Sequence, residues 1–131
     1  MKSIGFIGYS AMKFDENEAK KIIKNIFASF DDNEEYAIVS GATNMGIPKL
    51  VYEEANRHEN MSLIGVMCKD GYTCELYPCD TIIAVGENWG DESETFIDLI
   101  EELYKIGGGP QSEKELKMAL DAGLPTYEFK L

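Results

Sequence analysis

The chain has 131 residues, close to the size of one domain, and 44% of them are hydrophobic, which suits a single core. Its formal net charge of −12 argues against non-specific binding to nucleic acid or to an anionic membrane, because both need a basic surface. No apolar run approaches the roughly 18 residues that a membrane helix needs, and the N-terminal segment lacks the pattern of a secretory signal. We therefore expect one cytoplasmic domain over residues 1–131.

The three cysteines, Cys68, Cys74 and Cys79, are an odd number without an export signal, which favours free thiols in a reducing compartment. Their spacing is not a usual zinc pattern, and His58 lies far from them in the sequence. We expect no metal site and no cofactor, and we interpret the cysteines as partly buried small hydrophobic residues.

Short apolar runs alternate with amphipathic segments along the whole chain. The apolar runs predict strands over residues 3–9, 36–39, 62–67, 80–85 and 103–106, and the alternating residues 127–131 predict a last strand. The periodic segments predict helices that start after Asp15 with Glu18 as capping-box partner, at Pro48, after a cap at Asp91 or Ser93, and at Ser112 with a stop at Gly123. Residues 68–79 show no helical period and predict an irregular connection. This order is typical of an α/β fold, a Rossmann-like, doubly wound and mainly parallel sheet with helices on both faces.

Four of the predicted strands end in loops that contain glycine, after Ile7, Val39, Val85 and Ile106. In a doubly wound sheet, ligands bind at the carboxyl ends of the strands, near the point where strand order reverses. We therefore expect a crevice of small and polar residues at this edge. The candidate ligand-binding residues are Gly8, Tyr9, Ser10, Gly41, Ala42, Thr43, Asn44, Met45, Gly46, Glu87, Asn88, Trp89, Gly107, Gly108, Gly109, Gln111, Ser112 and Glu115.

The glycine triplet at 107–109 comes directly before a predicted helix. Glycine permits a left-handed backbone and close approach to a ligand, and the first amides of a helix form a positive end suited to phosphate. A tight turn that binds nothing explains the same residues. The loop at 41–46 has the glycine separation of a P-loop, but Ile47 and Pro48 stand where lysine and serine or threonine should follow, so a magnesium–triphosphate site is excluded. Trp89 either stacks on a base or fills an edge of the core.

Two of these loops carry a resemblance to a known superfamily. The chain resembles the SLOG superfamily, which includes LOG-type phosphoribohydrolases, the DNA-processing protein A family and nucleotide-signal sensor domains. Residues 40–47 look like the second-strand glycine loop of that group, and residues 107–115 look like its Pro-Gly-Gly-x-Gly-Thr-x-x-Glu motif. In this register Ser112 and Glu115 match the threonine and glutamate, whereas Gly107 replaces the proline and Gln111 the third glycine.

The resemblance implies a pocket for a nucleotide or nucleotide-derived molecule whose phosphate lies on the backbone of residues 108–112. In LOG-type enzymes the glutamate that matches Glu115 works with an arginine located between the third strand and the glycine motif. This chain has no arginine after Arg57, so Lys69 or Lys105 would have to supply the charge.

Because the arginine of the LOG-type enzymes is missing, two functions from different classes remain. The first is a binding module without chemistry, a sensor or sequestering protein of a kind that phages also carry. The alternative is a phosphoribohydrolase that cleaves an N-glycosidic bond with Glu115 as acid and base. A scaffold with a vestigial pocket is the third interpretation. The resemblance also implies a homo-oligomer, in which a neighbouring copy could supply Arg57.

Overall fold

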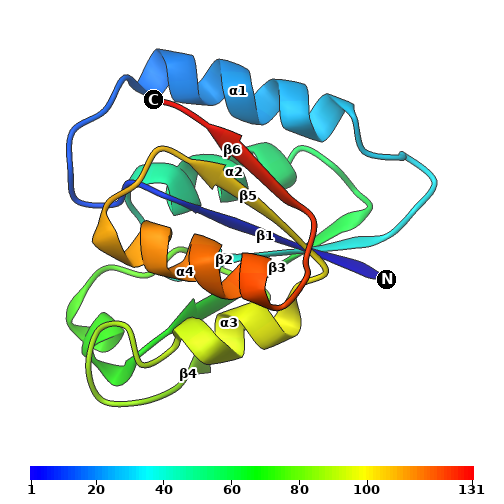
Figure 1. Ribbon diagram of the computed structural model, residues 1–131. Coiled ribbons are helices and arrows are strands. Elements are labelled where there is room, and N and C mark those ends of the chain that lie inside the picture. Colours follow the sequence, from blue (N-terminus) through cyan, green and yellow to red (C-terminus); the bar gives the residue numbers. More distant parts are fainter.

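The computed structural model describes residues 1–131, which form a six-stranded parallel sheet in the order β4-β3-β2-β1-β5-β6. The chain moves outward from β1 through β2 and β3 to β4, then crosses back to place β5 and β6 on the other side of β1 (Figure 1). The predicted α/β class is confirmed, and every strand pairing is parallel. The strands are β1 (Lys2–Gly8), β2 (Tyr36–Gly41), β3 (Met61–Met67), β4 (Thr81–Ala84), β5 (Glu102–Ile106) and β6 (Thr126–Phe129).

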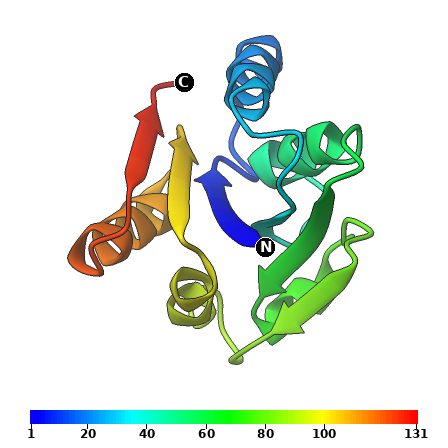
Figure 2. The same ribbon diagram turned by 90° about the vertical axis from the view of Figure 1, so that its right-hand side faces the viewer.

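The helices cover the two faces of the sheet in pairs. Figure 2 shows α1 and α2 on one side of the strands and α3 and α4 on the other. Within β1, Phe6 belongs to the core under α1 and α2, whereas the next residue, Ile7, belongs to the core under α3 and α4. Successive side chains of a strand point to opposite faces, so a run that is apolar throughout marks a strand covered on both sides. The helices are α1 (Glu16–Ala28), α2 (Gly46–Ala55), α3 (Ser93–Leu99) and α4 (Pro110–Asp121).

Two predicted helix boundaries are confirmed. Asp15 is the N-cap of α1, and its carboxylate accepts a hydrogen bond from the Glu18 amide at 3.1 Å. Gly123 follows α4 with φ of 76°, a left-handed conformation that ends a helix and suits glycine.

The predicted cap of α3 is wrong. Glu92 occupies the N-cap position without capping through its side chain, and Ser93 is the first helical residue. The Asp91 carboxylate instead accepts hydrogen bonds from the amides of Glu87 and Asn88 at 3.0 and 2.9 Å, so it closes the preceding loop. An aspartate in a glycine-bounded loop can bond backbone amides on either side, and here the loop offers two.

The connection from β3 to β4 contains a short helix that the sequence did not predict. Residues Lys69–Thr73 form η1, a 3-10 helix of five residues, too short to show an apolar period. Gly71, within η1, packs so closely on the end of β3 that a Cβ there would lie 2.6 Å from the Met67 sulfur. Of the three free cysteines, Cys68 is buried, and burial raises the pKa of Cys79 to about 11.

The carboxyl ends of β1 and β5 meet at one edge of the sheet, at the left in Figure 1. The loop that leaves β1 and the N-terminus of α4 lie at this edge. Strand order reverses between β1 and β5, so this is the edge where a ligand site is expected. None of the helices has both the length and the apolar composition for crossing a membrane.

Candidate functional site

A cavity of about 300 Å³ opens at the carboxyl edge of the sheet, beside the point where strand order reverses. This volume is at the lower end of the range for small-molecule sites, which is about 300–1,000 Å³. It is lined by the ends of β1 and β2, the loop before α3 and the first turns of α4. The lining residues are Phe6, Ile7, Gly8, Tyr9, Ser10, Ala11, Met12, Ser40, Gly41, Ala42, Thr43, Pro48, Val66, Met67, Trp89, Glu92, Phe96, Gly109, Pro110, Gln111, Ser112 and Glu115.

The structure brings eleven of the predicted candidates together in this lining: Gly8, Tyr9, Ser10, Gly41, Ala42, Thr43, Trp89, Gly109, Gln111, Ser112 and Glu115. Seven others lie outside it: Asn44, Met45, Gly46, Glu87, Asn88, Gly107 and Gly108. These seven residues are close in sequence to lining residues, and several of them determine the conformation of the loops that contain the lining residues.

Gly46 brings two loops together. Its φ is 63°, and a Cβ would overlap the backbone of Tyr9 and Ser10. The next residue, Ile47, donates its amide to the Tyr9 carbonyl at 2.7 Å. The N-terminus of α2 therefore supports the loop after β1, and that amide is already used inside the protein. Asn44 donates its side-chain amide to the Glu75 carboxylate, which ties the same loop to the β3–β4 connection.

The glycine triplet forms the turn from β5 into α4. Gly107 and Gly108 have φ of 62° and 118°, values that favour glycine, and a Cβ on Gly108 would lie 2.5 Å from the Ser112 Cβ. Gly109 is the N-cap without a side-chain cap, and Pro110 opens the helix. The amides of Gln111 and Ser112 therefore have no partner within α4 and are available at the cavity wall. The Ser112 hydroxyl is 3.4 Å from the Gly8 carbonyl, to which it donates.

Glu115 lies one turn further along α4 and is only 6% exposed. Its Oε2 accepts a hydrogen bond from the Ser93 hydroxyl at 2.9 Å. Burial raises the pKa of Glu115 to about 7, and the charge of Glu92 adds to that rise. Hydrogen bonds from Ser93 and Gln111, together with the charge of Lys114, offset part of it. The carboxyl group is therefore partly protonated at neutral pH, as an acid catalyst or a switchable hydrogen-bond partner requires.

The loop before α3 places Trp89 at the cavity rim, with 53% of its surface exposed. Gly86 and Gly90 have φ of 79° and 99°, and the two hydrogen bonds to Asp91 close the turn between them. Glu92 follows at the cavity wall and is 6% exposed, and its Oε1 accepts from the Gly90 amide at 2.7 Å. Sequence reasoning missed Glu92 as a site residue, because nothing local separates it from the neighbouring surface acids.

Sequence reasoning also missed Ser40, Met12 and Ser93. Ser40 is fully buried at the end of β2 and donates its hydroxyl to the Phe6 carbonyl at 2.7 Å. Met12 contributes an exposed thioether to the lining, and Ser93 holds Glu115 from outside it. A serine directly before a predicted glycine loop was a usable signal for Ser40, whereas the contact from Ser93 to Glu115 joins residues 22 apart and has no local signal.

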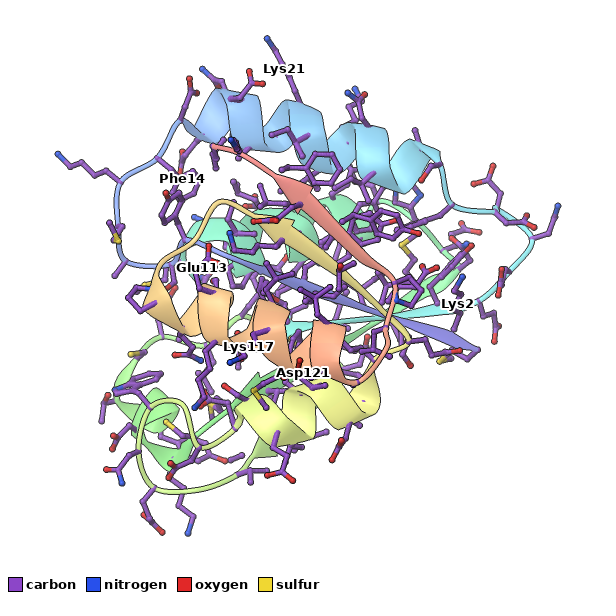
Figure 3. The ribbon with its side chains drawn as sticks, viewed as in Figure 1. Lys2, Phe14, Lys21, Glu113, Lys117 and Asp121 are labelled. Carbon is purple, nitrogen blue, oxygen red and sulfur yellow. The ribbon has the colours of Figure 1, made fainter.

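The lysines considered as substitutes for the missing arginine lie away from the cavity lining. The Lys105 side chain is 6% exposed and pairs with Glu113 at 2.9 Å and Glu128 at 3.4 Å. Figure 3 shows Glu113 in the first turn of α4, followed along the helix by Lys117 and Asp121. Lys69 pairs with Glu87 at 2.9 Å. No lysine, arginine or histidine lines the cavity, and the two carboxyl groups in the lining, those of Glu92 and Glu115, form no ion pair.

The fold is shared with solved structures of low sequence identity. The X-ray structure of TM1055, a structural-genomics target, superposes with a TM-score of 0.79 at 19% identity over 96% of this chain and 72% of that one. A structure of the Moco carrier protein from Chlamydomonas reinhardtii gives 0.78 at 19% identity over 99% and 77%. A second structure of the molybdenum cofactor carrier protein from the same organism gives 0.73 at 19% identity over 99% and 78%.

These matches define the class of fold. The chain has a Rossmann-like α/β fold, which is the class of fold that its sequence predicted. More particularly, the Moco carrier protein has this fold, and at 19% identity the similarity concerns the fold alone. No protein-family model matches the sequence, and the search of curated proteins finds no match either.

Proposed function

We propose that this protein binds a nucleotide or nucleotide-derived small molecule in the cavity at the carboxyl edge of its sheet, without chemical conversion. The observation that carries the proposal is the composition of that cavity. Glycine-bearing turns from β1, β2 and α4 bring backbone to its wall, and the exposed ring of Trp89 stands at its rim. Such a wall gives a flat ring a stacking surface and gives polar groups backbone donors.

The geometry supports a role for individual residues in this proposal. Trp89 stacks on the ring of the ligand, and base–aromatic stacking contributes about 1–3 kcal/mol. The free amides of Gln111 and Ser112 donate to a phosphate or carbonyl oxygen at the start of α4. Two of the structures with this fold are named as carriers of a cofactor, which supports binding without turnover as the role of this chain as well.

The alternative function is cleavage of the N-glycosidic bond of a nucleoside monophosphate. One observation favours it: the carboxyl group of Glu115 is buried, lines the cavity and has a pKa raised to about 7, near the optimum for a general acid at neutral pH. The absence of a cation from the lining disfavours it, because in LOG-type enzymes the glutamate that matches Glu115 works with an arginine.

The test is to incubate the protein with nucleoside monophosphates, ADP-ribose derivatives, cyclic nucleotides, nucleosides and pterins, then separate the protein by filtration. Both fractions are analysed by liquid chromatography and mass spectrometry. A compound retained unaltered supports the binding function. A free base with ribose phosphate supports the hydrolase, and Glu115→Gln should then abolish turnover while it retains binding. If no compound is retained or altered, both functions are contradicted for these ligands.

We also propose that the protein works in the cytoplasm as a homo-oligomer, with a sensing or sequestering role. The Arg57 side chain is 71% exposed and paired only with Glu54 of its own helix, so it is accessible to a neighbouring copy. Size-exclusion chromatography with light scattering measures the mass. Loss of ligand binding on Arg57→Ala, without loss of fold, is expected if a neighbour contributes this residue.

A further inference from the structure

Two buried carboxylates in the cavity form no ion pair. Glu92 and Glu115 are each 6% exposed, and they are the only residues in the lining with a charged side chain. The cations that sequence reasoning considered are held elsewhere, Lys69 by Glu87 and Lys105 by Glu113 and Glu128. A buried carboxylate is unfavourable unless hydrogen-bond donors replace the water that it has lost.

The protein supplies only part of those donors. Glu92 Oε1 accepts from the Gly90 amide at 2.7 Å, and Glu115 Oε2 accepts from the Ser93 hydroxyl at 2.9 Å. The Gln111 side chain also lies near enough to Glu115 to lower its pKa. Glu92 Oε2 accepts no hydrogen bond from the protein, and Gln111 is the only further donor to Glu115. Both side chains line the cavity, so each can still accept a hydrogen bond from a ligand.

The complementary ligand presents N–H donors to these oxygens. One oxygen of each carboxyl group already accepts from the protein, so a ligand meets two acceptors on two side chains, and hydrogen bonds to an ionised acceptor are short and strong. A heterocycle with a ring N–H beside an exocyclic amino group offers two donors on one flat edge, one for each acceptor. Glu92 is held by Gly90, the residue after Trp89, so the ring that stacks and the acid that accepts belong to one loop.

We propose that Glu92 and Glu115 bind the N–H and amino edge of a 2-amino-4-oxopyrimidine ring, the edge that guanine and the pterins share. This inference rests on the proposed function, because it assigns the chemistry of the ligand to the same cavity. An adenine ring places an acceptor nitrogen beside its amino group, and that lone pair faces a carboxylate unfavourably. Hypoxanthine keeps the ring N–H but lacks the amino group.

Isothermal titration calorimetry with two matched pairs of ligands tests the edge directly. Guanosine is compared with inosine, which lacks the amino group, and pterin with lumazine, which carries an oxygen in its place. We expect the amino-bearing member of the preferred pair to bind at least about tenfold more tightly, the discrimination of a good bidentate contact. Guanosine binding more tightly than pterin identifies a purine ligand, and the reverse order identifies a pterin.

Variants then assign the preference to the carboxylates. Glu92→Gln replaces one acceptor oxygen with a donor. We therefore expect about a tenfold loss of affinity for the amino-bearing ligand and little change in affinity for the matched ligand without the amino group. Glu115→Gln should act in the same direction. Glu94→Gln is the matched control, because Glu94 is exposed on α3 and does not line the cavity. Far-UV circular dichroism and an unfolding curve establish that each variant is folded.

The outcomes separate this inference from the proposed function. Equal affinities within both pairs, with binding still saturable, would overturn the edge preference and leave a nucleotide-binding protein. Retention of full selectivity by Glu92→Gln and Glu115→Gln would also overturn it. A simple diamine such as putrescine binding as tightly as guanosine or pterin would show selection of charge alone, which contradicts the inference. Absence of any retained compound would overturn both proposals.

Discussion

The carboxyl group of Glu115 lies under the first turns of α4, where Ser93 is its hydrogen-bonding neighbour from α3. Burial raises its pKa from 4.5 to about 7, so the folded protein holds a proton that the unfolded chain has released between these values. Stability that depends on this proton is fully present below pH 4.5 and is lost as the pH rises through 7. The loss amounts to about 3 kcal/mol, at 1.36 kcal/mol per unit.

Glu115→Gln should remove this pH dependence. A neutral amide carries no desolvation penalty for charge at high pH. As the pH rises from about 4.5 to 8, the free energy of unfolding of the variant should therefore increase relative to that of the unaltered protein by up to about 3 kcal/mol. Urea unfolding across this range measures the difference, and Glu94→Gln, on the exposed side of α3, is the control. A difference between Glu115→Gln and the unaltered protein that does not change with pH would contradict the assigned protonation of Glu115.

Gly108 makes the turn into α4 possible. Its φ is 118°, and a Cβ would lie 2.5 Å from the Ser112 Cβ, so Gly108→Ala combines backbone strain with a clash. We expect a loss of about 2–3 kcal/mol in the free energy of unfolding. Gly123→Ala is the matched control: its φ is 76° but nothing lies within 4 Å, so about 1 kcal/mol of strain alone is expected. Equal losses in both variants would show that the contact with Ser112 does not matter.

At the scale of the elements, the loop Gly86–Glu92 has the form of a closed turn that presents Trp89. The two amides that bond Asp91 join its start to its end. Asp91→Ala should therefore make the loop more mobile and lower the free energy of unfolding by about 1–2 kcal/mol. Because Trp89 is the only tryptophan, acrylamide quenching of its fluorescence reports the loop, and quenching should increase. Asp98→Ala, on exposed α3 surface, should leave it unchanged, and unchanged quenching in Asp91→Ala would argue against the role of Asp91.

The elements also show how far sequence reasoning reaches. The central strands were predictable because a sheet covered on both faces needs unbroken apolar runs, which β1 and β2 have. The turn at residues 107–109 was predictable because three glycines precede a proline and a helical pattern. Glu92 was not predictable, because its burial depends on packing of α3 against α4, and the polar run 91–94 gives no sign of which acid turns inward. The 3-10 helix η1 was missed for a related reason, since five residues carry no period.

Gly46 illustrates the same limit at the site. The sequence correctly indicated a position that needs close approach, but the approaching group is the backbone of Tyr9 and Ser10 and not a ligand. The local sequence reveals that a glycine is needed. The identity of its neighbour depends on the tertiary structure, which places the N-terminus of α2 against the loop after β1. The same holds for Lys105, whose partners come from α4 and β6.

At the scale of the whole molecule, the net charge and the two acids of the cavity oppose an anionic ligand, whereas the backbone donors at the start of α4 favour one. The protein carries a net charge of −12, and the cavity adds two carboxylates without a cation. Salt screens this repulsion, and at about 0.15 M the Debye length has fallen to about 8 Å. Binding of a nucleoside monophosphate should therefore strengthen with salt, roughly twofold or more between about 20 and 300 mM NaCl.

The corresponding nucleoside is the control for this prediction, because it has no phosphate to be repelled and its affinity should change little over the same range. Calorimetric titrations of both ligands at the two salt concentrations measure the effect. At a site built around a lysine or arginine, the affinity for the monophosphate would fall with salt, since salt weakens attraction between unlike charges. Weaker binding of the monophosphate at high salt would thus reveal a cation at the cavity, and the neighbouring copy that carries Arg57 would be its first candidate source.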